Sequence, residues 1–523
     1  MKHNPSISAQ AHHRGARLRG AAAIALILLS GCVVGPRYQV PAVATPEAFK
    51  ESSAAAYQST APGTWQPARP QDALLKGKWW ESFGEPELNA LEEQLDISNQ
   101  TIAQAFQSFM AARAQVREAR ASYFPTLTTT PAYAKGQSSG ATGGGVSLSA
   151  GGSSFASSGG GTYQDVSLPF DVSWEPDLWG RIRNTVRESR YATQVSAADL
   201  ENQRLTEQAD LAVYYFELRG QDTLQDLYNR TIEADKKSLQ LTHALLDTGI
   251  DSPQDVAAAE AILANAQATA IGIATNRALY EHAIATLIGK PAPSFSMPVR
   301  SLTTAVPTIP VGVPSQLLQR RPDIAAAERT MAQANALIGV EMAAYFPTLN
   351  LTASGGFESA VINTLLTAPA RFWTLGASAS QTLFDGGLRK ATLSQYRAQY
   401  DADVAAYRQT VLTAFQQVED YISTVRVLSQ QIASQQAAES AAQRYLNVAL
   451  SRYQTGMDPY VDVVTAQVSL LTDQQTEVTL RVSEMVAAVQ LVQALGGGWD
   501  VTQLPTAQKI TTQQASQQVA DTP

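Results

Sequence analysis

Residues 388–455 read LRKATLSQYRAQYDADVAAYRQTVLTAFQQVEDYISTVRVLSQQIASQQAAESAAQRYLNVALSRYQT, a stretch that contains neither proline nor glycine. An earlier stretch, 181–248, contains a single glycine, Gly220. Proline and glycine are the residues that most often end a helix, so each stretch predicts a continuous helix of about 64 residues, or about 96 Å. A helix of this length far exceeds the usual three or four turns and must therefore pack against partners along its length.

An apolar stripe follows one face of the second long helix. It comprises Leu393, Tyr396, Tyr400, Val404, Tyr407, Val411, Phe415, Val418 and Ile422. Several pairs in it, such as Leu393 and Val404, are 11 residues apart. A repeat of 11 residues favours nearly straight or slightly right-handed helix packing over a left-handed heptad coil.

The two long stretches belong to two copies of one plan. The motif YFPTL at 123–127 recurs at 345–349, an offset of 222, whereas Thr248-Gly249 recurs as Thr455-Gly456, an offset of 207. The difference lies between these points, where the first copy carries a Gly/Ser stretch at 136–161 that the second copy lacks. The sequence therefore predicts a duplicated unit of about 200 residues, much too long for a solenoid repeat.

Each copy also carries a strand pattern. Apolar and polar residues alternate over 166–174, and the second copy alternates similarly over 349–357 and 373–380. Segments of about ten alternating residues suit tilted strands that cross a bilayer. The Gly/Ser stretch is most simply a surface loop of the first hairpin.

Lengths constrain how these elements assemble. The helix before each strand pair and the helix after each Thr-Gly turn together match the long helix, so each copy predicts one long and one composite helix running antiparallel. Four strands cannot close a membrane barrel alone, because single-chain membrane barrels start at about eight. We therefore expect three subunits, which would contribute about 12 strands and a hollow ring of helices.

The N-terminal segment resembles a secretion signal that ends at a lipidation site. Basic residues precede an apolar run at 21–29, and Leu-Ser-Gly then leads into Cys32, the only cysteine in the chain. Removal of residues 1–31 takes away four basic and no acidic side chains, so the net charge falls from -8 to -12. This charge argues against nucleic-acid partners. The remaining chain has no uninterrupted run of 18 apolar residues, so no transmembrane helix is expected.

Nothing in the sequence favours an enzyme. The only histidines after the signal are His243 and His282, and no metal-ligand spacing or nucleophile motif is present. Gly496-Gly497-Gly498 lacks the lysine of a phosphate-binding loop and is interpreted as a helix terminator. We therefore expect no catalytic residues, no metal and no cofactor other than a covalent lipid on Cys32.

Ordered motifs along the chain resemble a known family. They are Gly31-Cys32, WWESF at 79–83, DLWGR at 177–181, LQRRPDI at 318–324, LFDGG at 383–387 and LGGGW at 495–499. Together they make the chain similar to the outer-membrane efflux ducts of the TolC and OprM type, in their lipoprotein branch. The resemblance implies an α+β membrane protein with a trimeric 12-stranded β-barrel, four strands from each subunit, continuous with a long periplasmic α-helical barrel.

The resemblance also implies a periplasmic tip, formed by the turns after the two long helices, that opens when the pump assembles. By position, Val461 would form an apolar constriction and Asp462 a carboxylate ring, with Asp255 as a further acidic contributor. The turn residues Arg452, Tyr453, Thr455, Gly456, Thr248 and Gly249 would contact a periplasmic adaptor. For each aspartate the alternative is a helix cap, and for each turn a glycine-terminated helix.

The expected organisation follows from these motifs. It is a signal peptide at 1–31, a lipid-anchored equatorial segment at 32–87, repeat 1 at 88–290, a linker at 291–321, repeat 2 at 322–497 and a partly disordered tail at 498–523. Repeat 1 holds a helix, a hairpin at about 125–175, the long helix 181–248 and a helix at 253–288; repeat 2 holds a helix, a hairpin at about 347–384, the long helix 388–455 and a helix at 459–495.

The predicted function is that of a passive exit duct for small molecules, gated at its tip. Its expected partners are an adaptor and an inner-membrane transporter of the RND type, and its expected location is the outer membrane, reaching into the periplasm. Two alternatives stay open: a duct for type I protein secretion, and a periplasmic scaffold lipoprotein that does not span the membrane. The strand pairs argue against the scaffold.

Overall fold

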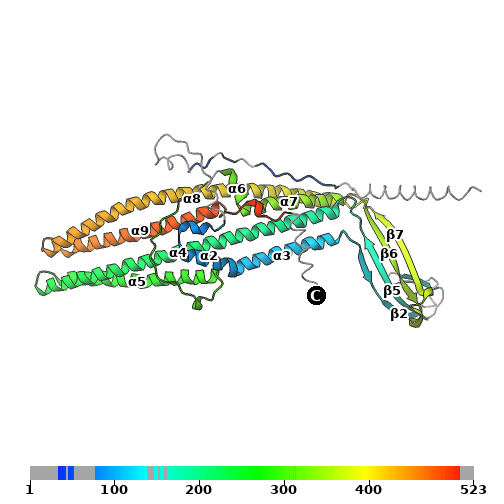
Figure 1. The fold of residues 1–523 in the computed structure, drawn as a ribbon, viewed down its shortest axis with the longest axis horizontal. Coiled ribbons are helices and arrows are strands. Elements are labelled where there is room, and N and C mark those ends of the chain that lie inside the picture. Colours follow the sequence, from blue (N-terminus) through cyan, green and yellow to red (C-terminus); the bar gives the residue numbers. More distant parts are fainter. Residues whose placement is uncertain are drawn as a thin grey trace, which may run out of the picture. The chain divides into compact units, whose positions relative to one another are not determined.

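The computed structural model describes residues 33–42, 45–46, 48–51, 77–137, 146–150, 153–157, 162–309, 311 and 314–506. The chain divides into two compact units (Figure 1). Unit 1 comprises Met1–Val40, Ala111–Thr193 and Arg329–Val404, and unit 2 comprises Pro41–Met110, Gln194–Glu328 and Ala405–Pro523. Cys32 and the predicted signal segment 1–31 lie outside the described residues.

Unit 1 is built on an antiparallel sheet. Its strands are β1 (Thr126–Thr129), β2 (Ala132–Gln137), β5 (Thr162–Trp174), β6 (Thr348–Ser359) and β7 (Arg371–Ser380). β1 and β2 both pair with β5, which pairs with β6, and β6 pairs with β7. Since β1 and β2 lie in sequence along one partner, the sheet has the width of four strands.

The sequence predicted a loop for the Gly/Ser stretch at 136–161, but part of this stretch forms strands. β3 (Val146–Ala150) and β4 (Ser153–Ser157) pair as a separate antiparallel hairpin inside it. The main sheet leaves large apolar side chains exposed on β5 and β7, with Phe170 at 45%, Trp373 at 78% and Leu375 at 75%. The chain alone therefore does not cover its sheet.

The recurring motifs build the junctions between strands and long helices. Asp177 accepts hydrogen bonds from the backbone N–H groups of Ile182 and Arg183, and Asp385 does the same for Gly387 and Arg389. Each aspartate thus caps the start of a long helix, where backbone N–H groups lack partners. A stacked pair of rings, Trp179 and Phe346, lies in the same region with centroids 4.7 Å apart.

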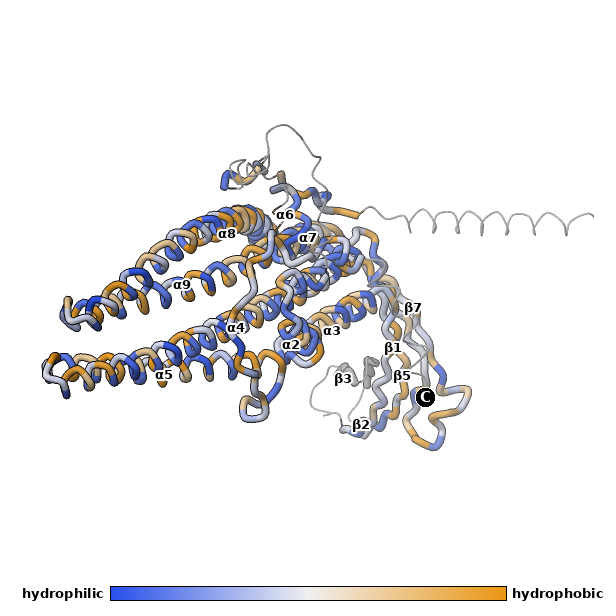
Figure 2. The backbone as a smooth tube through the Cα atoms, turned by 60° about the vertical axis from the view of Figure 1, so that its left-hand side comes forward, coloured by the Kyte–Doolittle hydropathy of each residue, from blue (hydrophilic) through white to orange (hydrophobic). Residues whose placement is uncertain are grey.

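Helices make up most of unit 2, and four of them, α3, α4, α7 and α8, contribute residues to both units. The helices are α2 (Pro86–Ser98), α3 (Gln100–Ala121), α4 (Arg181–Asp247), α5 (Pro253–Leu287), α6 (Pro314–Arg320), α7 (Pro322–Ala343), α8 (Leu388–Gln454) and α9 (Tyr460–Ala494). Short 3-10 turns are η2 (Trp79–Phe83), η3 (Ala292–Ser294), η4 (Ile362–Thr364), η5 (Ala368–Ala370) and η6 (Val501–Gln503). Within unit 2, α4 runs beside α5, and α8 beside α9 (Figures 1 and 2).

Three expectations need correction. The first helical segment is broken at Asn99, whose backbone is extended and whose side chain accepts from the Ile102 N–H as a cap for α3. The stretch 291–321 is not only a linker, because α6 lies in it. The sequence also predicted no transmembrane helix, whereas α5 is long and apolar enough to cross a bilayer by length and composition alone. Its many alanines give a high average hydropathy although polar residues interrupt every apolar run.

The main core of unit 2 forms where η2 meets the helices. Trp79 and Phe83 of η2 pack with Phe216 of α4, Ile284 of α5 and Val489 of α9, all of them buried. Apolar residues recur along these helices in Figure 2. Burial of each large side chain contributes about 1.5–3 kcal/mol, so this cluster fixes α2, α4, α5 and α9 against one another.

Two glycines permit close approaches in unit 2. A Cβ on Gly220 would lie 2.5 Å from Cγ2 of Val482, so the one glycine in α4 admits the α9 side chain. Gly496 has a φ of 94°, and its Cβ would lie 2.1 Å from the Arg320 carbonyl oxygen. The LGGGW and LQRRPDI motifs therefore pack directly together.

Candidate functional site

The turns after the two long helices lie together at one end of unit 2 (Figure 1). We call the turns 248–252 and 455–459 the tip. Gly249 and Gly456 have φ values of 78° and 70°, in the left-handed region where a side chain would be strained. Each glycine thus ends its long helix, as the sequence indicated for a Gly-terminated helix.

In the first turn, Asp255 acts as a helix cap. Its carboxylate accepts hydrogen bonds from the Ser252 N–H at 3.2 Å and the Ser252 hydroxyl at 2.6 Å, and its own N–H donates to Ser252 Oγ. This is a capping box at the start of α5. The capping alternative is therefore realised at Asp255, while the carboxylate stays at the exposed tip.

The second turn carries an exposed ion pair. Arg452 Nε and Nη2 lie 2.5 and 2.8 Å from the Asp458 carboxylate oxygens. The hydrogen bond from Arg452 lowers the pKa of the Asp458 carboxyl. Val461 is 59% exposed and Asp462 lies in the first turn of α9. Thr455 is exposed and donates to the Arg452 carbonyl oxygen.

Two tyrosines connect the two turns. Tyr453 of α8 donates its hydroxyl to Asp251, and lies 3.3 Å from the Thr242 hydroxyl of α4. Tyr460 of α9 shares a hydrogen bond of 3.1 Å with Ser238 of α4. Burial raises the pKa of both phenols, so both stay protonated and able to donate. The pair α8/α9 is thereby tied to α4 at the tip.

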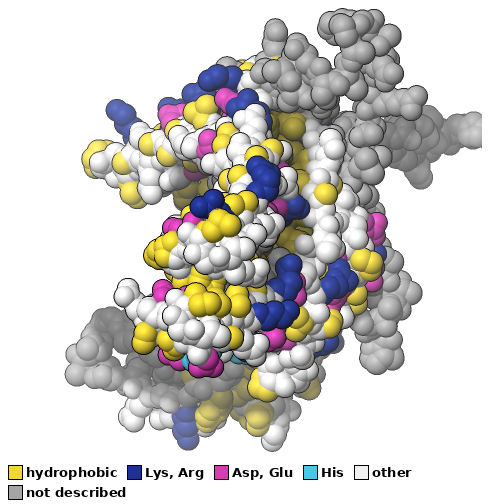
Figure 3. All heavy atoms as spheres, turned by 90° about the vertical axis from the view of Figure 1, so that its left-hand side faces the viewer, with side chains coloured by type: hydrophobic (Ala, Val, Ile, Leu, Met, Phe, Trp, Pro, Cys, Tyr) yellow, Lys and Arg dark blue, Asp and Glu magenta, His cyan; other side chains and the backbone are white. Residues whose placement is uncertain are grey.

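Tyr453 corrects one expectation. It is 3% exposed and packs with Ala449, Tyr460 and Val463, so its side chain points into the tip and is not exposed for contact with a partner. The other turn residues lie at the surface, and Figure 3, which faces this end of the molecule, shows hydrophobic side chains there among acidic and basic ones. Sequence reasoning missed Asp251, which lies in the first turn, and Tyr460, which begins α9 directly after the second turn.

A buried carboxyl lies under the tip. Asp235 of α4 is 3% exposed, and its Oδ2 has no hydrogen-bond partner in the described part of the chain. Burial raises the pKa of Asp235 to about 6, from 3.8. The folded state therefore favours the neutral acid and is weakened when this carboxyl ionises.

Stability is expected to fall as the pH rises through this range. The contribution of neutral Asp235 is complete below pH 3.8 and is lost as the pH passes about 6. Asp235→Asn should remove about 2 kcal/mol of that dependence between about pH 4 and pH 7.5. Thermal unfolding of the detergent-extracted protein across this range measures it, and equal pH profiles for both proteins would contradict the assignment.

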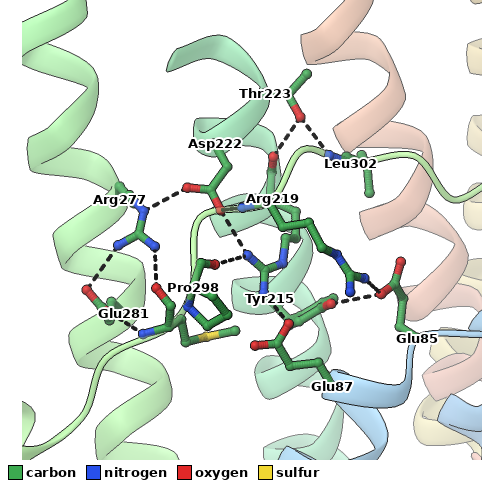
Figure 4. A network of polar contacts seen from close by, with 12 residues as sticks. Glu85, Glu87, Tyr215, Arg219, Asp222, Thr223, Arg277, Glu281, Pro298 and Leu302 are labelled. Carbon is green, nitrogen blue, oxygen red and sulfur yellow. Dashed lines mark hydrogen bonds and ion pairs between the residues drawn. The ribbon is translucent and has the colours of Figure 1, made fainter. Parts of the chain in front are cut away.

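A second polar cluster joins the middle of α4 to α5 (Figure 4). Arg219 of α4, 1% exposed, donates to Asp222 at 2.9 Å, to Glu87 of α2 at 2.5 Å and to the Pro298 carbonyl oxygen at 2.7 Å. Arg277 of α5 donates to the other oxygen of Asp222 at 2.7 Å. The buried charges of Arg219 and Asp222 are therefore paired with one another, although Nε of Arg219 has no hydrogen-bond partner in the described part of the chain.

The same cluster fixes the segment that joins the two halves of the chain. Asp222 accepts from the Arg300 N–H at 2.9 Å, and Thr223 accepts from the Leu302 N–H at 2.8 Å. Tyr215 donates to Glu85 at 2.9 Å, and burial raises the pKa of Tyr215 to about 12. The cluster thus holds α2, α4, α5 and residues 298–302 together.

Within the described residues, no group of three or more His, Cys, Asp and Glu side chains could hold a metal ion.

Residues 91–290 and 313–497 match the family described as outer membrane efflux protein. The chain belongs to this family. Its members are channel components of efflux systems in the outer membrane.

Individual relatives support this assignment. The chain is 32% identical to the solvent efflux pump outer membrane protein SrpC of Pseudomonas putida over 485 residues, which cover 92% of this chain and 98% of SrpC. It is 29% identical to the outer membrane protein OprJ of Pseudomonas aeruginosa over 487 residues, 92% of this chain and 96% of OprJ. It also shares the fold of the outer-membrane channel OprN, with a TM-score of 0.79, 28% identity and coverage of 90% of this chain and all of OprN.

Proposed function

We propose that three copies of this chain form a passive exit duct, with a 12-stranded β-barrel above a hollow ring of helices. The observation that carries this proposal is the sheet, whose outer strands β1, β2 and β7 each have one unpaired edge among the described residues. An open sheet edge cannot lie in lipid, because its N–H and C=O groups would have no partners. Neighbouring copies would pair these edges and close the barrel.

Exposed apolar side chains on the helices support the same assembly. They include Ile271 and Leu279 on α5, Leu412 and Val448 on α8, and Val468 on α9, all more than half exposed. Burial of such side chains favours association between chains. In the trimer these side chains would lie between subunits. An acyl chain on Cys32 would anchor each subunit to the outer membrane.

The tip is the gate of this duct. Val461 and Asp462, in the first turn of α9, would each occur three times around the axis, with Asp255 contributing a further carboxylate. Arg452, Thr455, Gly456, Thr248 and Gly249 would meet the hairpin of a periplasmic adaptor. An RND-type inner-membrane transporter would supply the energy for export.

Removal of the constriction is expected to raise the resting conductance. Val461→Ala with Asp462→Ala shortens the apolar side chain and removes the carboxylate, so the closed tip should conduct several-fold better in planar bilayers. Val427→Ala, which shortens an exposed valine of α8 away from the tip, is the matched control. An unchanged conductance in the double variant would remove Val461 and Asp462 from the gate.

The cargo is proposed from the relatives' names. SrpC is named for solvent efflux and a relative from Pseudomonas putida, ArpC, for antibiotic efflux. We expect this duct to export small apolar organic molecules. Deletion of its gene should increase sensitivity to solvents or antibiotics, and expression of the intact chain should restore resistance. No change in sensitivity to either class, with the partners present, would contradict this cargo.

A further inference from the structure

A cationic cavity lies in unit 1, beside the point where the described chain begins. Its volume is about 550 Å³, and it lies between the segment 33–38, α4 and α7. Arg37 and Arg187 line it, and no acidic side chain does. Among the described residues neither guanidinium has an acidic partner, because Arg187 donates only to Asn184, at 3.0 Å, and Arg37 has no ion pair.

The walls of the cavity are fixed by specific contacts. The Val34 N–H donates to the Trp179 carbonyl oxygen at 3.0 Å, and Asn184, 3% exposed, donates to the Val34 carbonyl oxygen at 3.0 Å. Asn335 of α7 donates to the Pro36 carbonyl oxygen at 3.2 Å. The segment 33–38 is thereby held open across the two helices, with Arg37 at its exposed edge.

A close approach of two glycines sets the position of this segment. A Cβ on Gly35 would lie 2.8 Å from the Gly339 Cα, and a Cβ on Gly339 would lie 2.5 Å from Asn184 Nδ2. Larger residues at either position would displace the segment or the asparagine. The cavity is therefore a feature of the sequence and not a gap left by loose packing.

The cavity has the chemistry of an anion site at a membrane surface. Guanidinium groups without acidic partners are suited to bind phosphate oxygens. The rings of Tyr38 and Tyr191, whose centroids are 6.3 Å apart, also line the cavity, and tyrosine is enriched at the headgroup level of bilayers. The cavity begins one residue after Cys32, the position expected to carry lipid, and the family resides in the outer membrane.

We propose that this cavity binds the phosphodiester headgroup of a membrane glycerophospholipid, with Arg37 and Arg187 as its phosphate ligands. Basic pockets of this kind recognise anionic lipid headgroups. The bound lipid would hold the segment 33–38 against α4 and α7 at the membrane surface. This site goes beyond the duct function and does not depend on the gate.

The test is native mass spectrometry of the full-length protein in detergent, titrated with phosphatidylglycerol, with diacylglycerol and with inorganic phosphate. We expect phosphatidylglycerol to stay bound and diacylglycerol not to. Arg37→Gln with Arg187→Gln should weaken phosphatidylglycerol binding by about tenfold or more, the loss expected for two charge-assisted contacts. The matched control is Arg117→Gln with Arg397→Gln, which removes two exposed arginines from unit 1 and should bind like the unaltered protein.

Three results would overturn the proposal: equal phosphatidylglycerol binding by the Arg37/Arg187 variant, equal binding of diacylglycerol, or inorganic phosphate that binds as tightly as the lipid. The last result would identify a site for free phosphate. Conductance in planar bilayers, measured on the Arg37/Arg187 variant, distinguishes a failure of the lipid site from a failure of the proposed duct. An intact conductance with lost lipid binding supports the site, whatever the gate mutants show.

Discussion

Arg219→Met is expected to destabilise the folded protein by about 3–5 kcal/mol, the cost of breaking a buried ion pair by removing one partner. Methionine keeps the length of the side chain but leaves Glu87 and the Pro298 carbonyl oxygen without their donor. Asp222, whose side chain is fully buried, keeps only Arg277 as a cation. The measurement is the thermal unfolding midpoint of the detergent-extracted protein, together with the fraction that remains assembled.

Arg230→Met is the matched control for this prediction. Arg230 also lies on α4 and pairs with an aspartate, Asp226, at 3.1 Å, but both side chains are more than half exposed. An exposed pair contributes at most about 1 kcal/mol. Equal midpoints for Arg219→Met and Arg230→Met would show that the Arg219 cluster does not hold the helices.

Tyr453→Phe is expected to open the tip. The phenylalanine ring fills the same space among Tyr460, Ala449 and Val463 but cannot donate to Asp251 or Thr242. A hydrogen bond to a charged group contributes about 1.5–3 kcal/mol, so the ratio of closed to open tips should fall about ten- to a hundredfold per subunit. The measurement is the open probability of single channels in planar bilayers.

Tyr445→Phe separates this effect from a general effect of the substitution. Tyr445 lies on α8 as well, is 45% exposed and has no hydrogen bond in the described part of the chain. Loss of the Tyr445 hydroxyl should leave the open probability of the channel unchanged. If Tyr453→Phe behaves like Tyr445→Phe, the hydroxyl of Tyr453 does not hold the tip closed.

The large elements were accessible from the sequence because their signals are local. The absence of proline and glycine over 388–455 corresponds to α8, which runs Leu388–Gln454, and the Thr-Gly pairs lie where the long helices end. The break at Asn99 was missed because an asparagine cap has no strong signal inside an alanine-rich stretch. The hairpin inside 146–157 was missed because a Gly/Ser-rich composition resembles a loop.

The polar contacts were harder to predict, since they join residues far apart in the chain. Arg219 and Glu87 are 132 residues apart, and Tyr453 and Asp251 are 202 apart. One signal was present: Gly220 is the single glycine of α4 and lies beside Arg219, where α9 approaches. The inward direction of Tyr453 follows from packing on Ala449 and Val463, which a motif comparison cannot show.

The most direct test of the duct is single-particle imaging of the detergent-extracted, full-length protein. We expect particles of three chains with a threefold axis, along which a hollow channel runs through both the sheet and the helices. A monomeric particle, or a trimer with a solid axis, would contradict it, because open sheet edges would then have to be covered in some other way.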